Sequence, residues 1–214
     1  MTDPLLSRLH ERLAAGAVTI VVALSCHALA FAQPVGFVER HWYDGTRQRT
    51  VWMAPNEIAV VFDPAAAPKT RSDAERRVTR STPGAVLEKQ RGPVSIFQLP
   101  EGTGPETRAR ALRAENGVRH ASPVFYEGSI GPDNTLVLSG EIIVGFRAAM
   151  SNEALADFAR KYGVRLIKAL DVLPNTFVFD ARSAADSLTL ANTIFESGQV
   201  DLAQPNWIKN ATRR

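Results

Sequence analysis

The sequence predicts an α+β protein in which two antiparallel sheets, each with helices on one face, follow one another along a chain of 214 residues. The first observation behind this prediction is an internal repeat. Two segments recur: NEIAVVF at 56–62 as GEIIVGF at 140–146, and GVRHASPVFY at 117–126 as GQVDLAQPNWI at 198–208. The first pair is offset by 84 positions (Glu57 to Glu141) and the second by 82 (Pro123 to Pro205), so the two copies are nearly collinear.

The second observation is the composition, which is that of an ordinary globular protein. Hydrophobic residues make up 45% of the chain and charged residues 22%, which excludes disordered and collagen-like classes. A net charge of +3 is too small to indicate a polyanionic partner by itself. The single cysteine, Cys26, excludes a disulfide framework, and the four histidines lie far apart in the sequence. We therefore expect neither a metal site nor a cofactor.

Residues 1–32 are predicted to be a secretory signal peptide. Arg8 and Arg12 precede an apolar run over 13–26, and Ala30-Phe31-Ala32 has the small-x-small pattern of a cleavage site. A transmembrane helix, which needs about 20 apolar residues, is the less favoured alternative because the run is shorter. We therefore expect a bacterial protein that is secreted or periplasmic and has no membrane association after cleavage.

The lead-in 33–55 is predicted to form a β-hairpin, because Phe37–Tyr43 and Thr50–Met53 flank Asp44-Gly45. The first copy, 56–128, then begins with the strand NEIAVVF. Ser72 and Glu75 are expected to form a capping box at the start of its first helix. Its helices are rich in arginine, which favours a solvated face, with an acidic partner as the alternative.

The second copy, 140–208, follows a linker at 129–139 and shows its elements more clearly. After the strand 141–146, a helix is predicted from its N-cap Ser151 to Gly163. Strands at 164–170 and 176–180 follow, and then a helix that opens at a capping box of Ser183 and Asp186. A short strand at 200–203 completes the order β-α-β-β-α-β. This order is that of a ferredoxin-like sandwich, so we expect two in tandem.

Candidate catalytic residues are few. After signal cleavage the only histidines are His41 and His120, and neither lies near a nucleophile motif. Glu57 and Glu141 open equivalent strands and are interpreted as solvated strand-start residues rather than as an acid–base pair. A βαββαβ unit with Phe177 and Phe179 on one strand invites comparison with RNA-binding modules, but the aromatic-rich signature strand is missing and export separates the chain from RNA. We expect no nucleic-acid partner.

These motifs resemble the amino-terminal pro-region of bacterial secreted subtilisin-like serine proteases (subtilases). The resemblance covers Trp42–Ile208 and rests on the hairpin YDGTRQRTVWM, the two repeated strands and, most specifically, the closing phrase at 191–208. Gln204 departs from the family, in which an acidic residue is usual. The catalytic subtilase motifs Asp-Ser-Gly, His-Gly-Thr-His and Gly-Thr-Ser-Met-Ala do not occur in these 214 residues, so we expect a chain that is not an enzyme.

The resemblance implies a chaperone and inhibitor that lays its open sheet face on the catalytic domain of a subtilisin-like serine protease. Its carboxyl-terminal tail, 209–214, would enter the substrate cleft. The implied partner-binding residues are Trp207, Ile208, Lys209, Asn210, Ala211, Thr212, Arg213 and Arg214. Two alternatives remain open at this point: an inactive amino-terminal remnant of a subtilase, and an envelope module for protein interactions.

Overall fold

The computed structural model describes residues 35–182 and 186–209, and the predicted signal peptide lies outside them. Among these residues, no helix is long and apolar enough to span a bilayer. The elements are β1 (Val38–Asp44), β2 (Arg47–Phe62), α1 (Arg71–Ser81), β3 (Val86–Arg91), β4 (Val94–Gln98), α2 (Pro105–Leu112), β5 (Val118–Tyr126), η1 (Pro132–Asn134), β6 (Thr135–Gly145), α3 (Asn152–Tyr162), β7 (Arg165–Ala169), β8 (Thr176–Asp180), α4 (Ser187–Glu196) and β9 (Leu202–Lys209).

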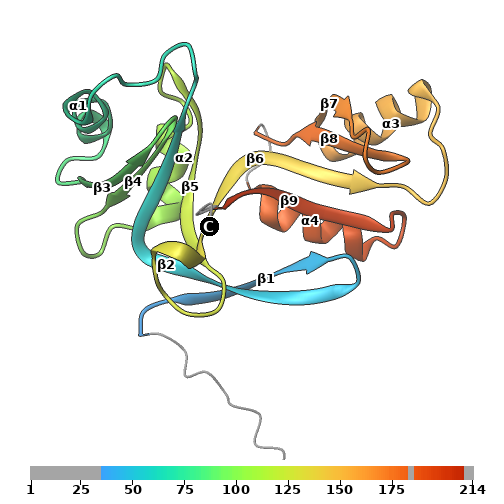
Figure 1. Cartoon of the computed structure of the whole chain (residues 1–214), viewed down its shortest axis with the longest axis horizontal. Helices are drawn as coiled ribbons and strands as arrows, with labels where there is room; N and C mark the ends of the chain where they lie inside the picture. The colour runs from blue at the N-terminus through green and yellow to red at the C-terminus, as the bar shows by residue number, and fades with distance from the viewer. Residues whose placement is uncertain (1–34, 183–185, 210–214) are drawn as a thin grey trace, which may run out of the picture. The chain divides into compact units, whose positions relative to one another are not determined.

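The described strands form one continuous antiparallel sheet of nine strands rather than the two separate sheets expected, and its two parts have the same strand order (Figure 1). We call residues 47–126 the first half and residues 135–209 the second half. The first half has the order β3-β4-β2-β5, and the second has β7-β8-β6-β9. Both are the order of a ferredoxin-like βαββαβ unit. Pairing of β5 with β6 joins the halves, so the predicted α+β class with antiparallel sheets is confirmed.

The two halves also share their strand register. In the first half, Ile58 lies opposite Pro123 on one side and Phe97 on the other. In the second half, Ile142 lies opposite Pro205 and Phe179 in the same way. The pairing of each first strand also shifts its register just before these isoleucines, between Met53 and Ile58 in β2 and between Leu138 and Ile142 in β6. Motifs that match in the sequence therefore occupy matching places in the sheet.

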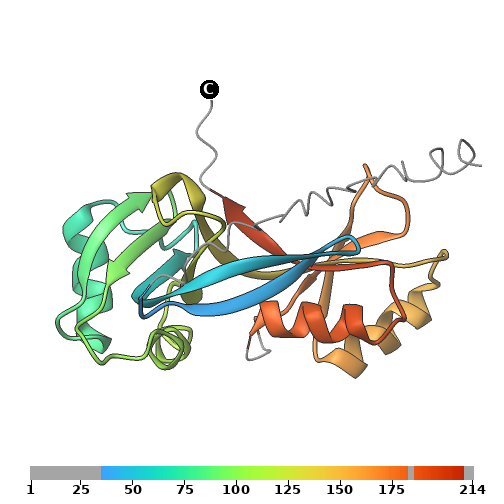
Figure 2. The same ribbon diagram turned by 90° about the horizontal axis from the view of Figure 1, so that it is seen from below.

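Each half has its own apolar core between its sheet and its helices. The core of the first half contains Phe62 and Phe97, and that of the second half contains Phe158 and Phe179. Figure 2 shows both helices of the second half on one side of β6 and β9. We call the opposite side of each sheet its outer face.

A third core lies where the halves meet, and we call it the junction core. The first strands continue beyond their own sheets, so that β1, the first part of β2, the end of β5 and the start of β6 come together. The junction core consists of Trp42, Val51, Met53, Phe125, Leu136, Leu138 and Leu188, with Trp207 packed against it. The β1–β2 hairpin also reaches α4, where Asn192 donates a hydrogen bond to the carbonyl of His41 and Tyr43 stacks on Phe195. The hairpin therefore connects the two halves.

Several element boundaries differ from the sequence prediction. The N-cap of α1 is Thr70, whose hydroxyl accepts from the amide of Asp73, so the capping box predicted at Ser72 is wrong. Asp186 is itself the N-cap of α4, so the box predicted with Ser183, which lies outside the described residues, is also wrong. The hairpin turn is formed by Gly45 and Thr46, one position later than Asp44-Gly45.

The first and last strands of the second half are longer than expected. β6 begins at Thr135, inside the segment predicted as a linker, because its first residues pair with β5. β9 runs over 202–209 rather than 200–203, because its end pairs with the same part of β6. Local periodicity in the sequence carries no information about such pairing between distant segments.

Candidate functional site

The end of β9 is held firmly within the protein. Trp207 lies edge-on to the rings of Trp42 and Phe125, with centroid distances of 6.1 and 5.6 Å. Ile208 packs against the cluster that contains Ile96 and Val137. The tail implied by the sequence therefore starts from a fixed root.

Lys209 is the last described residue of that tail. Its ammonium lies 3.9 Å from the carboxylate of Glu127 and 5.8 Å from the ring centroid of Trp42. Its side chain is 55% exposed, so these contacts are those of a surface residue and add little stability. Asn210, Ala211, Thr212, Arg213 and Arg214, the other implied tail residues, lie outside the described part of the chain.

The outer face of the first half is buried. Ala59, Val61 and Ile96 on this face have exposed fractions of 0%, 6% and 8%. Val137 from β6 and Ile208 from β9 belong to the same apolar cluster. A small cavity of about 80 Å³ between these strands and Val94 is also lined by Lys89 and Arg91. The second half therefore covers much of the sheet that the first half would otherwise present to a partner.

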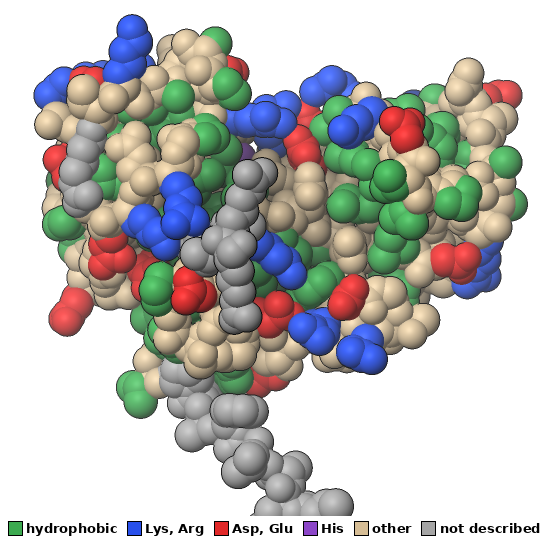
Figure 3. Space-filling view, viewed as in Figure 1, with side chains coloured by type: hydrophobic (Ala, Val, Ile, Leu, Met, Phe, Trp, Pro, Cys, Tyr) green, Lys and Arg blue, Asp and Glu red, His purple; other side chains and the backbone are tan. Residues whose placement is uncertain are grey.

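The outer face of the second half is open only in part, since Ile143 is half-buried while Val178 beside it is 4% exposed. Its β7 edge carries exposed aliphatic side chains. In β7, Leu166 and Ile167 are 38% and 41% exposed, and in the loop that follows, Val172 and Leu173 are 84% and 47% exposed. Leu166 lies opposite Phe179 and therefore points to the helix side of the sheet. Hydrophobic side chains gather on this face over β6, β8 and β7 (Figure 3). Exposed apolar groups concentrated in one place, rather than scattered, are typical of an interaction site.

A set of charged hydrogen bonds borders this face. Arg182 donates from Nε and Nη2 to the two carboxylate oxygens of Asp180, at 2.8 and 2.6 Å, and Arg165 donates to the same carboxylate at 2.8 Å. The hydrogen bonds from Arg182 lower the pKa of Asp180 and outweigh the opposing effect of burial. The Asp180 side chain is only 10% exposed, so the paired arginines keep a nearly buried charge compensated.

His120 is the buried histidine at the boundary between the halves. Its side chain is fully enclosed, and within the described residues neither ring nitrogen has a hydrogen-bond partner. A Cβ added at Gly140 would lie 2.7 Å from Nδ1 of His120, so only glycine permits this close packing. Burial, reinforced by the charges of Arg113 and Arg182, lowers the pKa of His120 to about 3. At neutral pH the ring is uncharged.

Glu57 and Glu141 have structural partners of their own and do not form an acid–base pair. Tyr126 donates its hydroxyl to Glu57 at 2.7 Å, and burial is the main cause of the raised pKa of Glu57. Glu141 accepts from Arg119 at 2.6 Å and from Asn206 at 2.8 Å. Each glutamate thus joins the first strand of its half to the last. The interpretation of both as solvated residues is wrong, since their partners and partial burial are not visible in the sequence.

The remaining candidates give no catalytic centre in the described residues. His41 lies 3.7 Å from the carboxylate of Glu196, at the surface. Phe179 packs against Phe158 in the core, and the half-buried Phe177 packs against Phe146 on the same side of the sheet, beneath the helices, which does not suit the stacking of RNA bases. Within residues 35–182 and 186–209, no group of three or more His, Cys, Asp and Glu side chains is placed to hold a metal ion.

Sequence reasoning missed the exposed aliphatic side chains of β7 and its loop. The segment 164–170 has apolar residues on both faces of the strand, which was the available signal, but a strand pattern does not tell which face is covered. The Asp180–Arg182 ion pair was missed as well, because the apolar alternation of a strand does not predict which side chain will pair with a carboxylate at its end.

Comparison with known proteins finds a similarity in the second half. Residues 133–206 match the family described as Fervidolysin N-terminal prodomain, a propeptide of the subtilase type. The match begins in the turn before β6 and ends in β9, so it spans the second half almost completely. Searches of curated proteins and of solved structures gave no match. The half that resembles a known prodomain therefore carries the exposed aliphatic side chains at the β7 edge.

Proposed function

We propose that the protein acts as a subtilase propeptide, which binds the catalytic domain of a subtilisin-like serine protease as an inhibitor, a folding chaperone or both. The observation that carries the proposal is the prodomain match at residues 133–206. The exposed aliphatic side chains at the β7 edge of that same segment support it, because a prodomain needs a free surface for its protease. In this role the module is a ligand of the enzyme and performs no chemistry itself.

The proposed contact surface has two parts. The first is the outer face of the second half with the exposed aliphatic side chains at its β7 edge, Ile167, Val172 and Leu173. The second is the tail, 209–214, whose root is fixed by Trp207 and Ile208. A fixed root reduces the entropy lost when the tail is ordered in a substrate cleft. We expect an interface of standard size, about 1,600 Å² in total.

The proposal also includes the organisation of the chain. We infer an export signal at 1–32, a hairpin at 33–55, two prodomain-like copies at 56–128 and 140–208, and a location outside the cytoplasm. The shared register of Ile58 and Ile142 supports the duplication. Because its outer face is buried by β6 and β9, the first copy would support the second rather than contact the protease.

Titration of the full chain into a subtilisin-like protease tests the proposal, with hydrolysis of a peptide substrate as the readout. The double variant Val172→Asp, Leu173→Asp should raise the inhibition constant at least about tenfold, since a buried apolar contact becomes a buried charge. Deleting 209–214 should weaken inhibition by a similar factor.

The matched control is Val86→Asp, because Val86 is a β3 residue of the first half that is 60% exposed. This variant should inhibit like the unmodified chain. Failure of the unmodified chain to inhibit any protease of this class, or to assist its refolding, would contradict the proposal. Equal effects of all three changes would contradict the assignment of the contact to the second half.

A further inference from the structure

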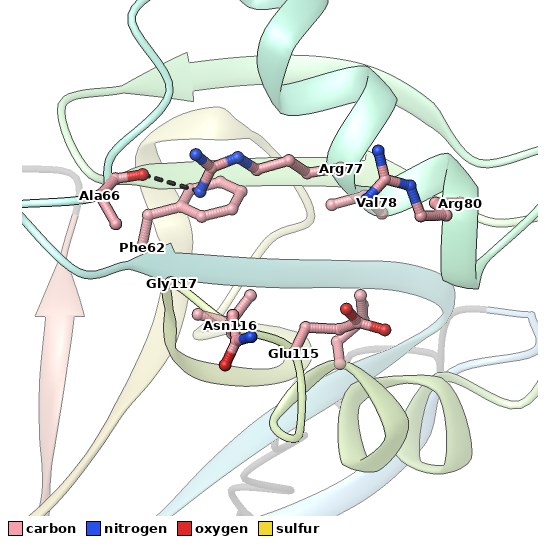
Figure 4. Close-up of a pocket in the computed structure, with 10 residues that line it drawn as sticks. Phe62, Ala66, Arg77, Val78, Arg80, Glu115, Asn116 and Gly117 are labelled. Carbon is pink, nitrogen blue, oxygen red and sulfur yellow. Dashed lines mark hydrogen bonds between the residues drawn. The ribbon is translucent and has the colours of Figure 1, made fainter.

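A basic groove crosses the first half on the side of its helices, away from the proposed protease contact. It consists of two neighbouring cavities of about 420 and 460 Å³ that share Ala66, Arg77 and Arg80. The helix α1 provides one wall, and the turn before β5, with Glu115 and Asn116, provides the other (Figure 4). Phe62 lies between the two walls.

The cations of the groove exceed its acids. Lys69, Arg76, Arg77 and Arg80 line it together with Asp73 and Glu115. Asp73 is occupied, because it pairs with Arg76 one turn further along α1. Among the residues that the structure describes, Lys69, Arg77 and Arg80 have no ion-pair partner. Three positive charges therefore remain available to a ligand.

One of these charges is already fixed in place. Arg77 donates from Nη1 to the carbonyl of Ala66 at 2.8 Å. The same nitrogen lies so close to Gly117 that a Cβ there would be 2.9 Å from it. Held by one nitrogen, the guanidinium keeps its other N–H groups for a carboxylate, and a preorganised arginine loses less entropy on binding.

The equivalent helix of the second half shows that the fold does not require these charges. In α3, Arg160 pairs with Asp157, and Lys161 donates to Gln199 at 3.0 Å and lies over the ring of Tyr162. The cations of α3 are thus satisfied within the protein. The unpaired cations of α1 call for another explanation.

We propose that this groove binds an extended peptide segment of a partner protein that carries two or three Asp or Glu residues. Two adjoining cavities suit an extended chain, and carboxylates suit the planar donors of Arg77 and Arg80. The acids Asp73 and Glu115 argue against a polyphosphate or nucleic acid, whose closely spaced charges they would repel. The inference does not rest on the proposed function, because the groove lies on the other half.

Fluorescence anisotropy with a labelled peptide of alternating Glu and Gly residues tests the proposal on the full chain. The double variant Arg77→Gln, Arg80→Gln should weaken binding at least about tenfold. The charge-matched control Arg47→Gln, Arg91→Gln, which changes exposed residues outside the groove, should stay within about twofold. Glu115→Gln should strengthen binding, because it removes the like charge of the opposite wall.

The variant Arg77→Lys, Arg80→Lys keeps the charge but not the planar donors, and it should recover only part of the affinity. Circular dichroism establishes that each variant is folded before its affinity is compared. Absence of binding at low salt, equal weakening by the control variant, or tighter binding of inorganic polyphosphate than of the peptide would each overturn the proposal.

Discussion

The two halves have the same strand order and register, yet the outer faces of their sheets are used differently. In the first half, Val61 and Ile96 are covered by residues of β6 and β9. In the second half, Ile143, the counterpart of the fully buried Ala59, is only half-buried, and Ile167 and Leu173 at the β7 edge are exposed. The same fold therefore serves in one half as an internal support and in the other as an accessible surface. The difference arises from what packs on each sheet and not from the sheets themselves.

The helices of the two halves differ in a complementary way. α3 is amphipathic, with Leu155 and Phe158 buried and its arginine paired. α1 buries only the smaller side chains Ala74 and Val78 and presents unpaired cations. In the first half, the outer face of the sheet is buried by internal packing, and the helix side carries the unpaired cations instead.

The largest expected effect tests whether the two halves unfold together. Phe97→Ala and Phe179→Ala remove fully buried rings at matching positions, and each should cost about 3–5 kcal/mol. Because β5–β6 pairing and the junction core link the halves, we expect one unfolding transition that both variants shift. Urea denaturation followed by circular dichroism measures this shift.

Tryptophan fluorescence provides the control, since Trp42 and Trp207 report on the junction core. Two separate transitions, of which each variant moves only one, would show that the halves unfold independently.

The next effect concerns the histidine at the boundary between the halves. The folded-state pKa of His120, about 3, lies below its unfolded value near 6.5, so the unfolded chain binds more protons between these pH values. Stability should therefore be lost as the pH falls from 6.5 towards 3, by about 3 kcal/mol between pH 7 and pH 4. Denaturation at several pH values measures the loss.

Variants separate the contribution of His120 to the pH dependence of stability from that of carboxylates that titrate over the same pH range. His120→Leu should remove most of the pH dependence, whereas His41→Gln, at the surface, should leave it unchanged. A His120→Leu variant with the full pH dependence of the unmodified chain would disprove the assignment.

The smallest effect compares the caps of equivalent helices. Thr70→Ala and Ser151→Ala each remove a side-chain oxygen that accepts from a backbone amide of the first turn, and each should cost about 1 kcal/mol. Ser72→Ala is the control, because Ser72 lies inside α1 and caps nothing. If Ser72→Ala lowered the melting temperature more than Thr70→Ala, the assignment of Thr70 as the N-cap of α1 would be contradicted.

The second half was largely predictable from its sequence. Ser151 and Gly163 bound α3 as expected, and β8 has the predicted limits at Thr176 and Asp180. Here the local signals agree, because amphipathic spacing and capping residues coincide. In the first half, the arginines of α1 blur the apolar spacing, and the cap was therefore placed two residues too late.

The candidate surface was predictable only in outline. Trp207 and Ile208 were expected to anchor the tail, and both pack at its root, but their contacts with Trp42 and the outer face of the first half depend on distant strands. The same reason explains why the buried His120 was not recognised. A strand pattern indicates that successive residues point to opposite faces of the sheet. Which segments pack on each face is decided by tertiary contacts, which the local pattern does not contain.

The position of β9 has a kinetic consequence. This last described strand supplies Ile208 to a cluster whose other members, such as Val61 and Ile96, come from much earlier in the chain. Contacts of such high sequence separation form late and slow the folding rate. During synthesis the first half would emerge with an apolar face that nothing yet covers, a state that is prone to aggregation and is bound by chaperones. The first half therefore stays incompletely covered until β9 is made.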